Sequence, residues 1–272
     1  MDLPDAAIDL VVSGDGTPIA YERSGAGSPL VLVHGTSGDH SGFRLVEPLL
    51  AAHFMVYAVD RRGRGRSGDS KGGYAIEQEF ADIAAVVGSL GEPVDLMGHS
   101  YGATVALGAA LRSRNVRRLV LYEPVFGEGE APELLARFDA SLARDEREEV
   151  LSSFLVEVIG LGPEELEQFR ASPLWAPRVA AAHTIPREIR AEEQYEPDPD
   201  ALAAFSTPVT LLLGDDSPGW ARRGTEVVHA GVPSSRVVPL RGQGHLAIVT
   251  APELVVTEVV RFLSDGRAVE TG

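Results

Sequence analysis

The segment DLMGHSYGATVAL, residues 95–107, places one serine between two glycines where two kinds of segment meet. The apolar residues before Ser100 predict a buried strand, and the alanine-rich residues after it predict a helix. Gly98 and Gly102 complete the pattern G-x-S-x-G, in which the serine sits in a strained turn where larger neighbours would collide with the strand and the helix. Because a strand precedes the turn and a helix follows it, we interpret Ser100 as a nucleophile.

A serine hydroxyl is a weak nucleophile at neutral pH and needs a base within hydrogen-bond reach. Of the seven histidines, His245 is the best placed, since LRGQGHLAI follows the last predicted strand and precedes the last predicted helix. That loop and Ser100 fall at the same C-terminal edge of the predicted sheet, so we expect the two side chains to meet. His99 is expected to point away from this site.

Acyl transfer also needs two backbone N–H groups aimed at the oxygen that becomes negatively charged. Tyr101, directly after the nucleophile, can supply one, helped by the N-terminus of its helix. The second should come from the loop HGTSGD after the strand PLVLV, and Thr36 is our candidate. Together these two residues predict an oxyanion hole.

Short β-rich segments alternate with helical patterns along the chain, which predicts an α/β fold with a mostly parallel sheet flanked by helices. The eight predicted strands are IDLVVS, TPIAYER, PLVLVH, FMVYAVD, PVDLMGH, VRRLVLY, PVTLLLG and SRVVPL. The link GDGTP between the first two is too short for a crossover helix and predicts an antiparallel hairpin. Helices are expected over residues 43–52, 74–90, 101–112, 220–230 and 252–264.

One long interval interrupts the alternation of predicted strands and helices. Residues 126–205 contain no convincing strand but several amphipathic helical stretches, such as APELLARFDASLARD and EREEVLSSFLVEVIG. We therefore predict a core of residues 1–125 and 206–272, into which residues 126–205 are inserted as a helical cap. Its aromatic residues Phe154, Phe169, Trp175 and Tyr195 are candidates to line a substrate pocket.

Taken together, these features resemble the α/β-hydrolases over nearly the whole chain. The resemblance rests on VLVHGTSG, YAVDRRGRGRSG, LMGHSYG and GQGH, which stand in that family's order and spacing. It implies a serine hydrolase fold without cofactor or metal, with the cap as a lid over the site. It also implies that Asp60 and the glycines of DRRGRGRSG shape a tight loop beside the oxyanion turn, with no catalytic part.

The acid of the expected triad has two candidates. In the family that the chain resembles, the acid usually stands three residues after the glycine ending the seventh strand, but here Gly214 is followed at that distance by Ser217. Asp216 stands one residue earlier. Haloalkane dehalogenases, which share the fold, can instead carry a glutamate at the end of the sixth strand, where this chain has Glu123. Both choices keep the order serine, acid, histidine; we favour Glu123 and keep Asp216 open.

The amino-acid composition limits the kinds of molecule that the chain is expected to bind. The 272 residues carry a formal net charge of -16, which argues against nucleic acid and anionic membrane surfaces as partners and leaves a small-molecule substrate. Residues 124–200 alone hold 18 Asp and Glu against 7 Arg, and this acidity is expected to disfavour anionic substrates. A homo-oligomer remains open.

No cofactor or metal is expected. The chain has no cysteine, which excludes disulfides, thiolate catalysis and cysteine-ligated metals. The segment GRGRSG lacks the Lys-Ser/Thr ending of a phosphate-binding loop. The N-terminus shows no signal-peptide pattern, and no segment is long and apolar enough to span a membrane, so a cytoplasmic location is expected.

The leading interpretation is an enzyme that hydrolyses an ester, thioester or lactone of a small molecule through an acyl-serine intermediate. The same scaffold hosts cofactor-free haloperoxidase-like, C–C bond hydrolysing and lyase activities, and the fold does not choose among them. A small-molecule receptor that has lost turnover is the alternative from another class. The pairing of Ser100 with His245 disfavours it.

Overall fold

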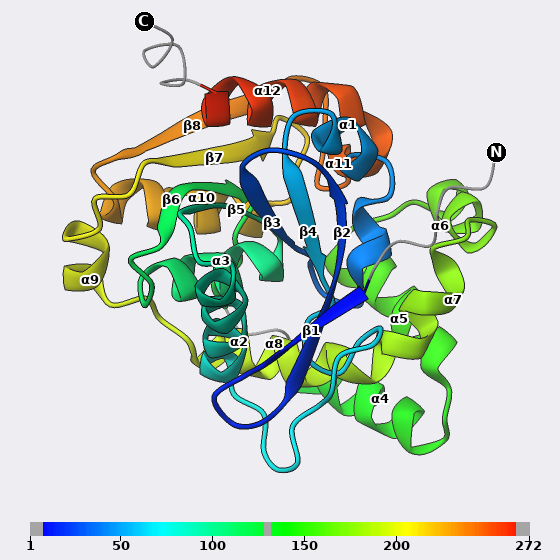
Figure 1. Cartoon of the computed structure of the whole chain (residues 1–272). Helices are drawn as coiled ribbons and strands as arrows, with labels where there is room; N and C mark the ends of the chain where they lie inside the picture. The colour runs from blue at the N-terminus through cyan, green and yellow to red at the C-terminus, as the bar shows by residue number, and fades with distance from the viewer. Residues whose placement is uncertain (1–7, 128–131, 265–272) are drawn as a thin grey trace, which may run out of the picture.

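The computed structural model describes residues 8–127 and 132–264. These residues form one eight-stranded sheet with helices packed on both faces and a further group of helices beside it (Figure 1). The strands are β1 (Ile8–Val12), β2 (Pro18–Gly25), β3 (Pro29–Val33), β4 (Met55–Val59), β5 (Val94–His99), β6 (Val116–Tyr122), β7 (Val209–Gly214) and β8 (Ser235–Leu240). All eight strands predicted from the sequence are present, so the predicted α/β fold is confirmed.

The strand order in the sheet is β1-β2-β4-β3-β5-β6-β7-β8. The first two strands form the expected antiparallel hairpin, β2 also pairs antiparallel with β4, and every other pairing is parallel. Parallel strands require crossover connections, which place helices over the faces of the sheet. The C-terminal ends of β3 and β5 to β8 therefore meet at one edge, and the candidate site residues follow these ends.

The core helices are α1 (Glu47–Ala51), α2 (Ile76–Ser89), α3 (Tyr101–Ala110), α10 (Gly219–Gly231), α11 (Ala247–Thr250) and α12 (Pro252–Ser264). The helix predicted over residues 43–52 is wrong in its first half. A short 3-10 turn, η1 (His40–Phe43), is capped by Asp39, whose side chain accepts a hydrogen bond from the Ser41 N–H. The helix α1 begins only at Glu47, with Pro48 in its first turn, because proline lacks the N–H that a helix interior needs.

Apolar side chains on the two faces of the sheet form two separate clusters. Along β3, Val31 and Val33 belong to one cluster and Leu30 and Leu32 to the other, and all four are fully buried. The first cluster includes residues of α2, α3 and α10, and the second includes residues of α1, α11 and α12. Because β3 is buried on both faces, its sequence is a continuous apolar run rather than an alternating one.

Between β6 and β7, the described residues contain no strand but several helices. These are α4 (Pro132–Ala143), α5 (Arg147–Ser153), the π-helical turn η2 (Phe154–Val158), α6 (Pro163–Arg170), α7 (Trp175–Ala181), the 3-10 turn η3 (Ala182–Thr184), α8 (Ile185–Gln194) and α9 (Pro199–Ala203). We call residues 132–203 the helical insertion. Eleven of its buried apolar residues, Phe138, Leu151 and Ile185 among them, form a third cluster. The predicted boundaries of the cap, 126 and 205, stay a prediction.

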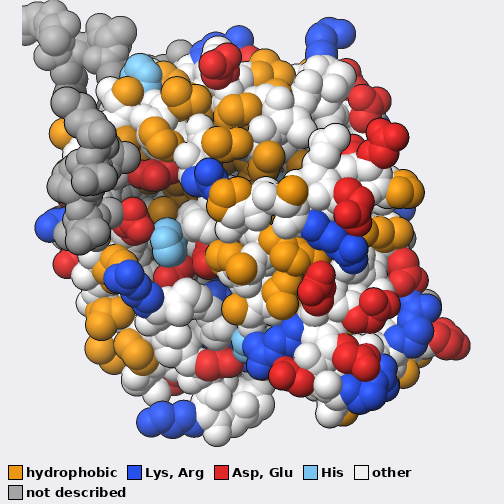
Figure 2. All heavy atoms as spheres, turned by 90° about the vertical axis from the view of Figure 1, so that its right-hand side faces the viewer, with side chains coloured by type: hydrophobic (Ala, Val, Ile, Leu, Met, Phe, Trp, Pro, Cys, Tyr) orange, Lys and Arg blue, Asp and Glu red, His pale blue; other side chains and the backbone are white. Residues whose placement is uncertain are grey.

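The surface of the helical insertion carries charges of both signs. Figure 2 looks onto the side on which Figure 1 shows α4 to α7, and its acidic and basic side chains are intermixed rather than separated by sign. Within the described ranges, no helix combines the length and the hydropathy that crossing a membrane requires.

Candidate active site

Ser100 lies in the turn between β5 and α3, with φ 58° and ψ -129°. This backbone conformation is costly for a residue with a side chain, so the surroundings must hold it in place. A Cβ atom on Gly98 would lie 2.2 Å from the Gly102 carbonyl oxygen, and one on Gly102 would lie 2.3 Å from the His34 carbonyl oxygen. Both glycines are therefore required by the close approach of the helix and of the loop after β3, as the motif predicts.

His245 and Glu123 are in direct contact. The Nδ1 atom of His245 lies 2.6 Å from Oε2 of Glu123. The glutamate follows β6 directly, has φ 52° and is fully buried. Its other oxygen, Oε1, accepts hydrogen bonds from the Gly214 N–H at 2.8 Å and from the Ser217 hydroxyl. Three protein donors thus satisfy a buried carboxylate that would otherwise be costly to hold away from water.

The structure does not bring the other candidate acid to the histidine. Asp216 is exposed, and its side chain forms no hydrogen bond or ion pair with any described residue, while its N–H donates to the Gln243 carbonyl at 3.0 Å. Ser217, at the position where the resemblance led us to look for the acid, is buried and donates to Glu123 instead. A hydroxyl at that position supports a carboxylate that comes from the neighbouring strand.

Ser100 and His245 line one small chamber of about 30 Å³, together with Gly35, Thr36 and His99. The structure contains no hydrogen bond between the Ser100 hydroxyl and the imidazole of His245. Catalytic hydrogen bonds of this kind often tighten only when the reacting complex forms. Because Nδ1 of His245 is engaged by Glu123, Nε2 is the ring nitrogen that can accept the Ser100 proton.

Of the two candidate oxyanion donors, Thr36 lines this chamber and Tyr101 directly follows Ser100 in the chain. Tyr101 is the first residue of α3, where N–H groups lack partners within the helix. Neither its N–H nor that of Thr36 donates a hydrogen bond to any described residue. A Cβ atom on Gly35 would come 2.9 Å from the Cβ of Ser100, so the loop after β3 passes directly over the nucleophile. Two N–H groups are thus free beside Ser100.

Three further residues hold the loop that carries His245. The expectation that His99 points away from the site is wrong: its ring centroid lies 4.6 Å from that of His245, and its Nε2 lies 2.9 Å from the His245 carbonyl oxygen. Burial lowers the pKa of His99 well below its usual value, so a neutral ring donates this bond. The Tyr122 hydroxyl donates to the Gly244 carbonyl, and Trp220 packs edge-on against His245 at 4.7 Å. Tyr122 and Trp220 were not predicted to be site residues, although Tyr122 ends a predicted strand at the edge where the site lies.

A larger cavity of about 200 Å³ adjoins the same serine and shares Thr36, Phe154 and Ile159 with the small chamber. Its other lining residues come from the segment after β6, from η2 and α8 of the insertion and from α10: Val125, Phe126, Gly127, Val158, Ile189, Glu192, Glu193, Trp220 and Arg223. The walls combine apolar side chains with the charged side chains of Glu192, Glu193 and Arg223, and pockets of this kind, with a few polar groups among apolar ones, bind small molecules.

Of the four aromatic residues expected at this pocket, only Phe154 lines it. Phe169 and Trp175 pack edge to face against each other within the insertion, with ring centroids 6.2 Å apart. Tyr195 packs on Phe80 of α2 at 5.0 Å. The expectation is wrong for these three because aromatic side chains at helical spacing bury one another before they reach a ligand.

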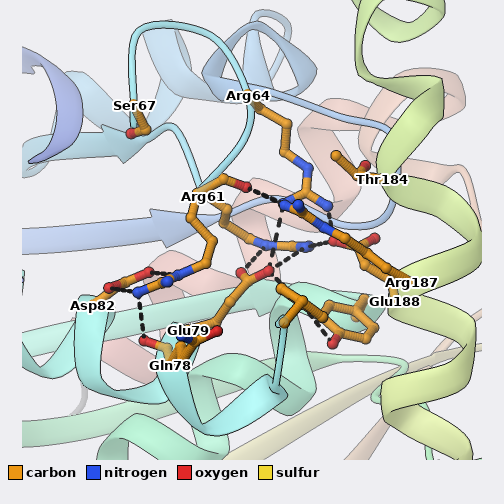
Figure 3. A network of polar contacts seen from close by, with 12 residues as sticks. Arg61, Arg64, Ser67, Gln78, Glu79, Asp82, Thr184, Arg187 and Glu188 are labelled. Atoms are coloured by element: carbon orange, nitrogen blue, oxygen red, sulfur yellow. Dashed lines mark hydrogen bonds and ion pairs between the residues drawn. The ribbon is translucent and has the colours of Figure 1, made fainter. Parts of the chain in front are cut away.

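A buried charged network joins the helical insertion to the core (Figure 3) and reaches the loop HGTSGD after β3, which we call the oxyanion loop. The Nε atom of Arg61 lies 2.8 Å from Glu79, and Glu188 of α8 contacts both Arg61 and Arg64. All four side chains are fully buried. The Arg61 N–H also donates to Nε2 of His34 at 3.1 Å, which connects the network to the first residue of the oxyanion loop.

Burial and the Arg61 cation lower the pKa of His34 well below its usual value. The neutral ring accepts at Nε2 and donates from Nδ1 to the Gly35 carbonyl at 2.9 Å. Burial together with neighbouring Arg61 lowers the pKa of Arg64 to about 9. Although burial opposes it, the cations of Arg61 and Arg64 hold the pKa of Glu79 below its usual range. The network therefore consists of charged groups that depend on one another.

One cluster of potential metal ligands occurs among the described residues. Asp39, His40 and Asp60 offer ligand atoms that lie within 4.8 Å of one another. However, Oδ1 of Asp60 lies 2.9 Å from the His40 N–H nitrogen and 2.7 Å from His40 Nδ1, and Oδ2 accepts from the Arg66 N–H. Protein donors occupy both oxygens, so the cluster does not fit a metal ion and instead shapes the loop after β4.

A serine in a strand-to-helix turn, then a carboxylate after a later strand and a histidine after the last strand, are the features by which the class of α/β-hydrolases is defined. The model of the alpha/beta hydrolase family matches residues 30–258. The chain belongs to that family.

Among solved structures, an alpha/beta hydrolase from Sphaerobacter thermophilus is 34% identical with a TM-score of 0.82, over 94% of this chain and 100% of that one. The esterase RhEst1 from Rhodococcus sp. ECU1013 is 28% identical with a TM-score of 0.78, over 94% of this chain and 98% of that one. These similarities extend through the helical insertion.

Among characterised sequences, the chain is 36% identical to a 2-hydroxy-6-oxo-2,4-heptadienoate hydrolase from Pseudomonas putida, over 43% of this chain and 45% of that protein. It is 35% identical to a soluble epoxide hydrolase from Corynebacterium sp. (strain C12), over 42% of this chain and 40% of that protein. The matches span less than half of either relative, and the two relatives are named for different reactions.

Proposed function

We propose that this protein hydrolyses carboxylic esters of small molecules, thioesters and lactones included, through an acyl-enzyme on Ser100. The observation that carries the proposal is the 2.6 Å contact between His245 Nδ1 and Glu123 Oε2, at the edge of the chamber that His245 shares with Ser100. This contact fixes the imidazole with its free nitrogen available to the serine.

In the first half-reaction, the Ser100 oxygen attacks the carbonyl carbon while its proton passes to Nε2 of His245. The oxygen that becomes negative accepts hydrogen bonds from the N–H groups of Thr36 and Tyr101. Glu123 stabilises the imidazolium that forms. The bond to the leaving group then breaks, and His245 returns the proton to the departing oxygen or sulfur.

In the second half-reaction, water attacks the acyl group on Ser100. His245 takes a proton from the water and delivers it to the serine oxygen as the acyl–serine bond breaks. The products are a carboxylic acid and the free enzyme. In this mechanism the helical insertion acts as the cap, since Phe154, Ile159 and Ile189 supply part of the wall over the nucleophile.

Chemistry distinguishes this proposal from epoxide opening. Attack of a serine hydroxyl on an epoxide would give an ether, which has no carbonyl carbon that water could attack to release the product. An ester, thioester or lactone gives an acyl-serine, which water can hydrolyse. The proposed steps use only side chains and backbone N–H groups of this chain, so we expect full activity after exhaustive treatment with a chelator.

The test is covalent labelling by a fluorophosphonate, which reports an activated serine. We expect a mass increase on the peptide that contains Ser100, lost in Ser100→Ala and in His245→Ala. Labelling that survives intact in both variants would mean that the nucleophile lies elsewhere.

A further inference from the structure

One arginine of the helical insertion lies beside the candidate nucleophile. Arg178 of α7 has its Nη1 atom 3.2 Å from the Ser37 hydroxyl and 3.5 Å from the Thr36 carbonyl oxygen. Its guanidinium carbon lies 5.2 Å from the centroid of the Phe169 ring. The side chain thus reaches from the insertion to the oxyanion loop, and it lines the same small chamber as Ser100 and His245.

The charge of Arg178 has no anionic partner among the described residues. Its Nε and Nη2 atoms donate no hydrogen bond there, and only Nη1 is engaged. Burial lowers its pKa to about 10, which still leaves a cation at neutral pH, and Asp39 acts on it only in the opposite sense. By contrast, Arg61 and Arg62, which are fully buried whereas Arg178 is partly exposed, each contact a carboxylate. A partly buried cation without a counter-ion is costly unless a ligand supplies one.

We propose that Arg178 binds a carboxylate of the substrate, so that the preferred substrates are esters carrying a carboxylate a few bonds from the scissile carbonyl. The inference rests on the proposed function and deepens it. Nε and Nη2 lie on one edge of the guanidinium plane, and two such N–H groups match the two oxygens of a carboxylate. A lysine at this position could not provide that fork.

The sizes of the two cavities indicate where each part of such a substrate binds. The chamber beside Arg178 is about 30 Å³, whereas the cavity on the other side of Ser100, which has both apolar and charged walls, is about 200 Å³. The short carboxylate-bearing arm is assigned to the first, which Arg178 lines, and the larger remaining part of the substrate to the second. This differs from the expectation that the acidic insertion disfavours anionic substrates. The acidic residues set the net charge, but an arginine lies at the nucleophile, where the local charge acts most strongly.

The experiment compares monoethyl succinate with ethyl succinamate, in which a neutral amide replaces the carboxylate at nearly the same size. We expect the wild-type protein to prefer the carboxylate. Arg178→Met should lower kcat/KM for monoethyl succinate by roughly 10- to 100-fold, the loss typical of a charge-assisted hydrogen-bonded pair, and change that for ethyl succinamate by less than about 3-fold. Arg178→Lys should fall between the two, because it keeps the charge without the fork.

Arg137→Met is the matched control, since it removes one positive charge from the same insertion at a side chain that is 58% exposed and pairs with Glu157. It should leave the preference unchanged at matched ionic strength. An equal fall for both substrates in Arg178→Met, or an unchanged preference, would overturn the proposal.

A binding measurement separates this proposal from the proposed function. In Ser100→Ala protein, succinate should raise the melting temperature and succinamide should not, and the added change Arg178→Met should abolish the succinate effect. If Ser100 is not the nucleophile, this binding persists while labelling fails. If Arg178 is not the carboxylate site, labelling persists and the succinate effect is absent or survives the loss of Arg178.

Discussion

His245 Nδ1 lies 2.6 Å from Oε2 of Glu123, a carboxylate that stands at the end of β6 rather than after β7. The contact joins two residues 122 positions apart in the chain. It also explains why Ser217 and the Gly214 N–H face inward, because both donate to the other oxygen of the same carboxylate. These contacts favour Glu123, directly after β6, as the acid that pairs with His245.

Replacing Glu123 by Gln should lower kcat by roughly 10³- to 10⁴-fold with little change in KM, because the imidazole loses its correct tautomer and the support for its charged form. Asp216→Asn is the control and should retain nearly full activity, since Asp216 is exposed and does not touch His245. Steady-state kinetics on both variants measure the difference. If Asp216→Asn lost most of its activity while Glu123→Gln kept it, Asp216 and not Glu123 would be the triad acid.

The acid should be transferable between the two strands. Ser217 already donates to Glu123, so its side chain reaches the region that a carboxylate must occupy. We expect the double variant Glu123→Ala/Ser217→Asp to recover at least about 10-fold in kcat over Glu123→Ala alone, since it restores a charge near Nδ1. Glu123→Ala/Ser217→Asn, which lacks the charge, is the matched control. Equal rates in the two double variants would show that position 217 cannot serve the histidine.

The free energy of unfolding should decrease below neutral pH because His99 is buried in its neutral form. Burial depresses the pKa of His99 in the folded protein, so between its usual value of 6.5 and the lower folded value the unfolded chain binds more protons than the native protein does. The free energy of unfolding therefore decreases as the pH falls below about 6.5, by at most about 1.4 kcal/mol per pH unit for one histidine.

Chemical denaturation of His99→Gln between pH 7 and pH 5 should show a shallower decrease than the wild-type protein. His53→Gln, at an exposed position, serves as the control and should keep the wild-type slope. A His99→Gln protein with the wild-type slope would contradict the account of a buried neutral ring.

The buried network should make Glu188 important for stability. Glu188→Gln leaves Arg61 and Arg64 with Glu79 as their remaining carboxylate, and breaking a buried pair in this way typically costs about 3–5 kcal/mol. The matched control is Glu157→Gln, which breaks an ion pair with Arg137 whose side chains are 42% and 58% exposed and should cost less than about 1 kcal/mol. Urea denaturation measures both. Similar losses in the two variants would contradict the role of burial.

Much of the fold could be predicted because its signals are local. Apolar runs such as PLVLV identify strands buried on both faces, and the glycines around Ser100 identify the turn from packing needs alone. The break between η1 and α1 could not be placed from hydrophobic periodicity, because Asp39 caps η1 through a hydrogen bond and Pro48, which lacks an N–H, is confined to the first turn of α1.

Neither the choice of the triad acid nor the position of Arg178 could be predicted, because both depend on contacts between residues far apart in the sequence. Whether Glu123 or Asp216 meets His245 depends on a backbone turn at φ 52° and on where Ser217 points, which no spacing along the chain determines. Arg178 belongs to an acidic stretch, and the net charge of that stretch predicts only that anionic substrates are disfavoured. Its contacts with Ser37 and Thr36, 141 and 142 residues away, show that it faces the site.

The central claim is an acyl-enzyme on Ser100. The direct measurement is the intact mass of the protein quenched in acid during turnover of p-nitrophenyl acetate, followed by mapping of the modified peptide. We predict one added acetyl group on the peptide that contains Ser100, with a burst of p-nitrophenol of about one equivalent, and neither in Ser100→Ala. Undiminished turnover in Ser100→Ala, or an acetyl group mapped only to another residue, would contradict the account.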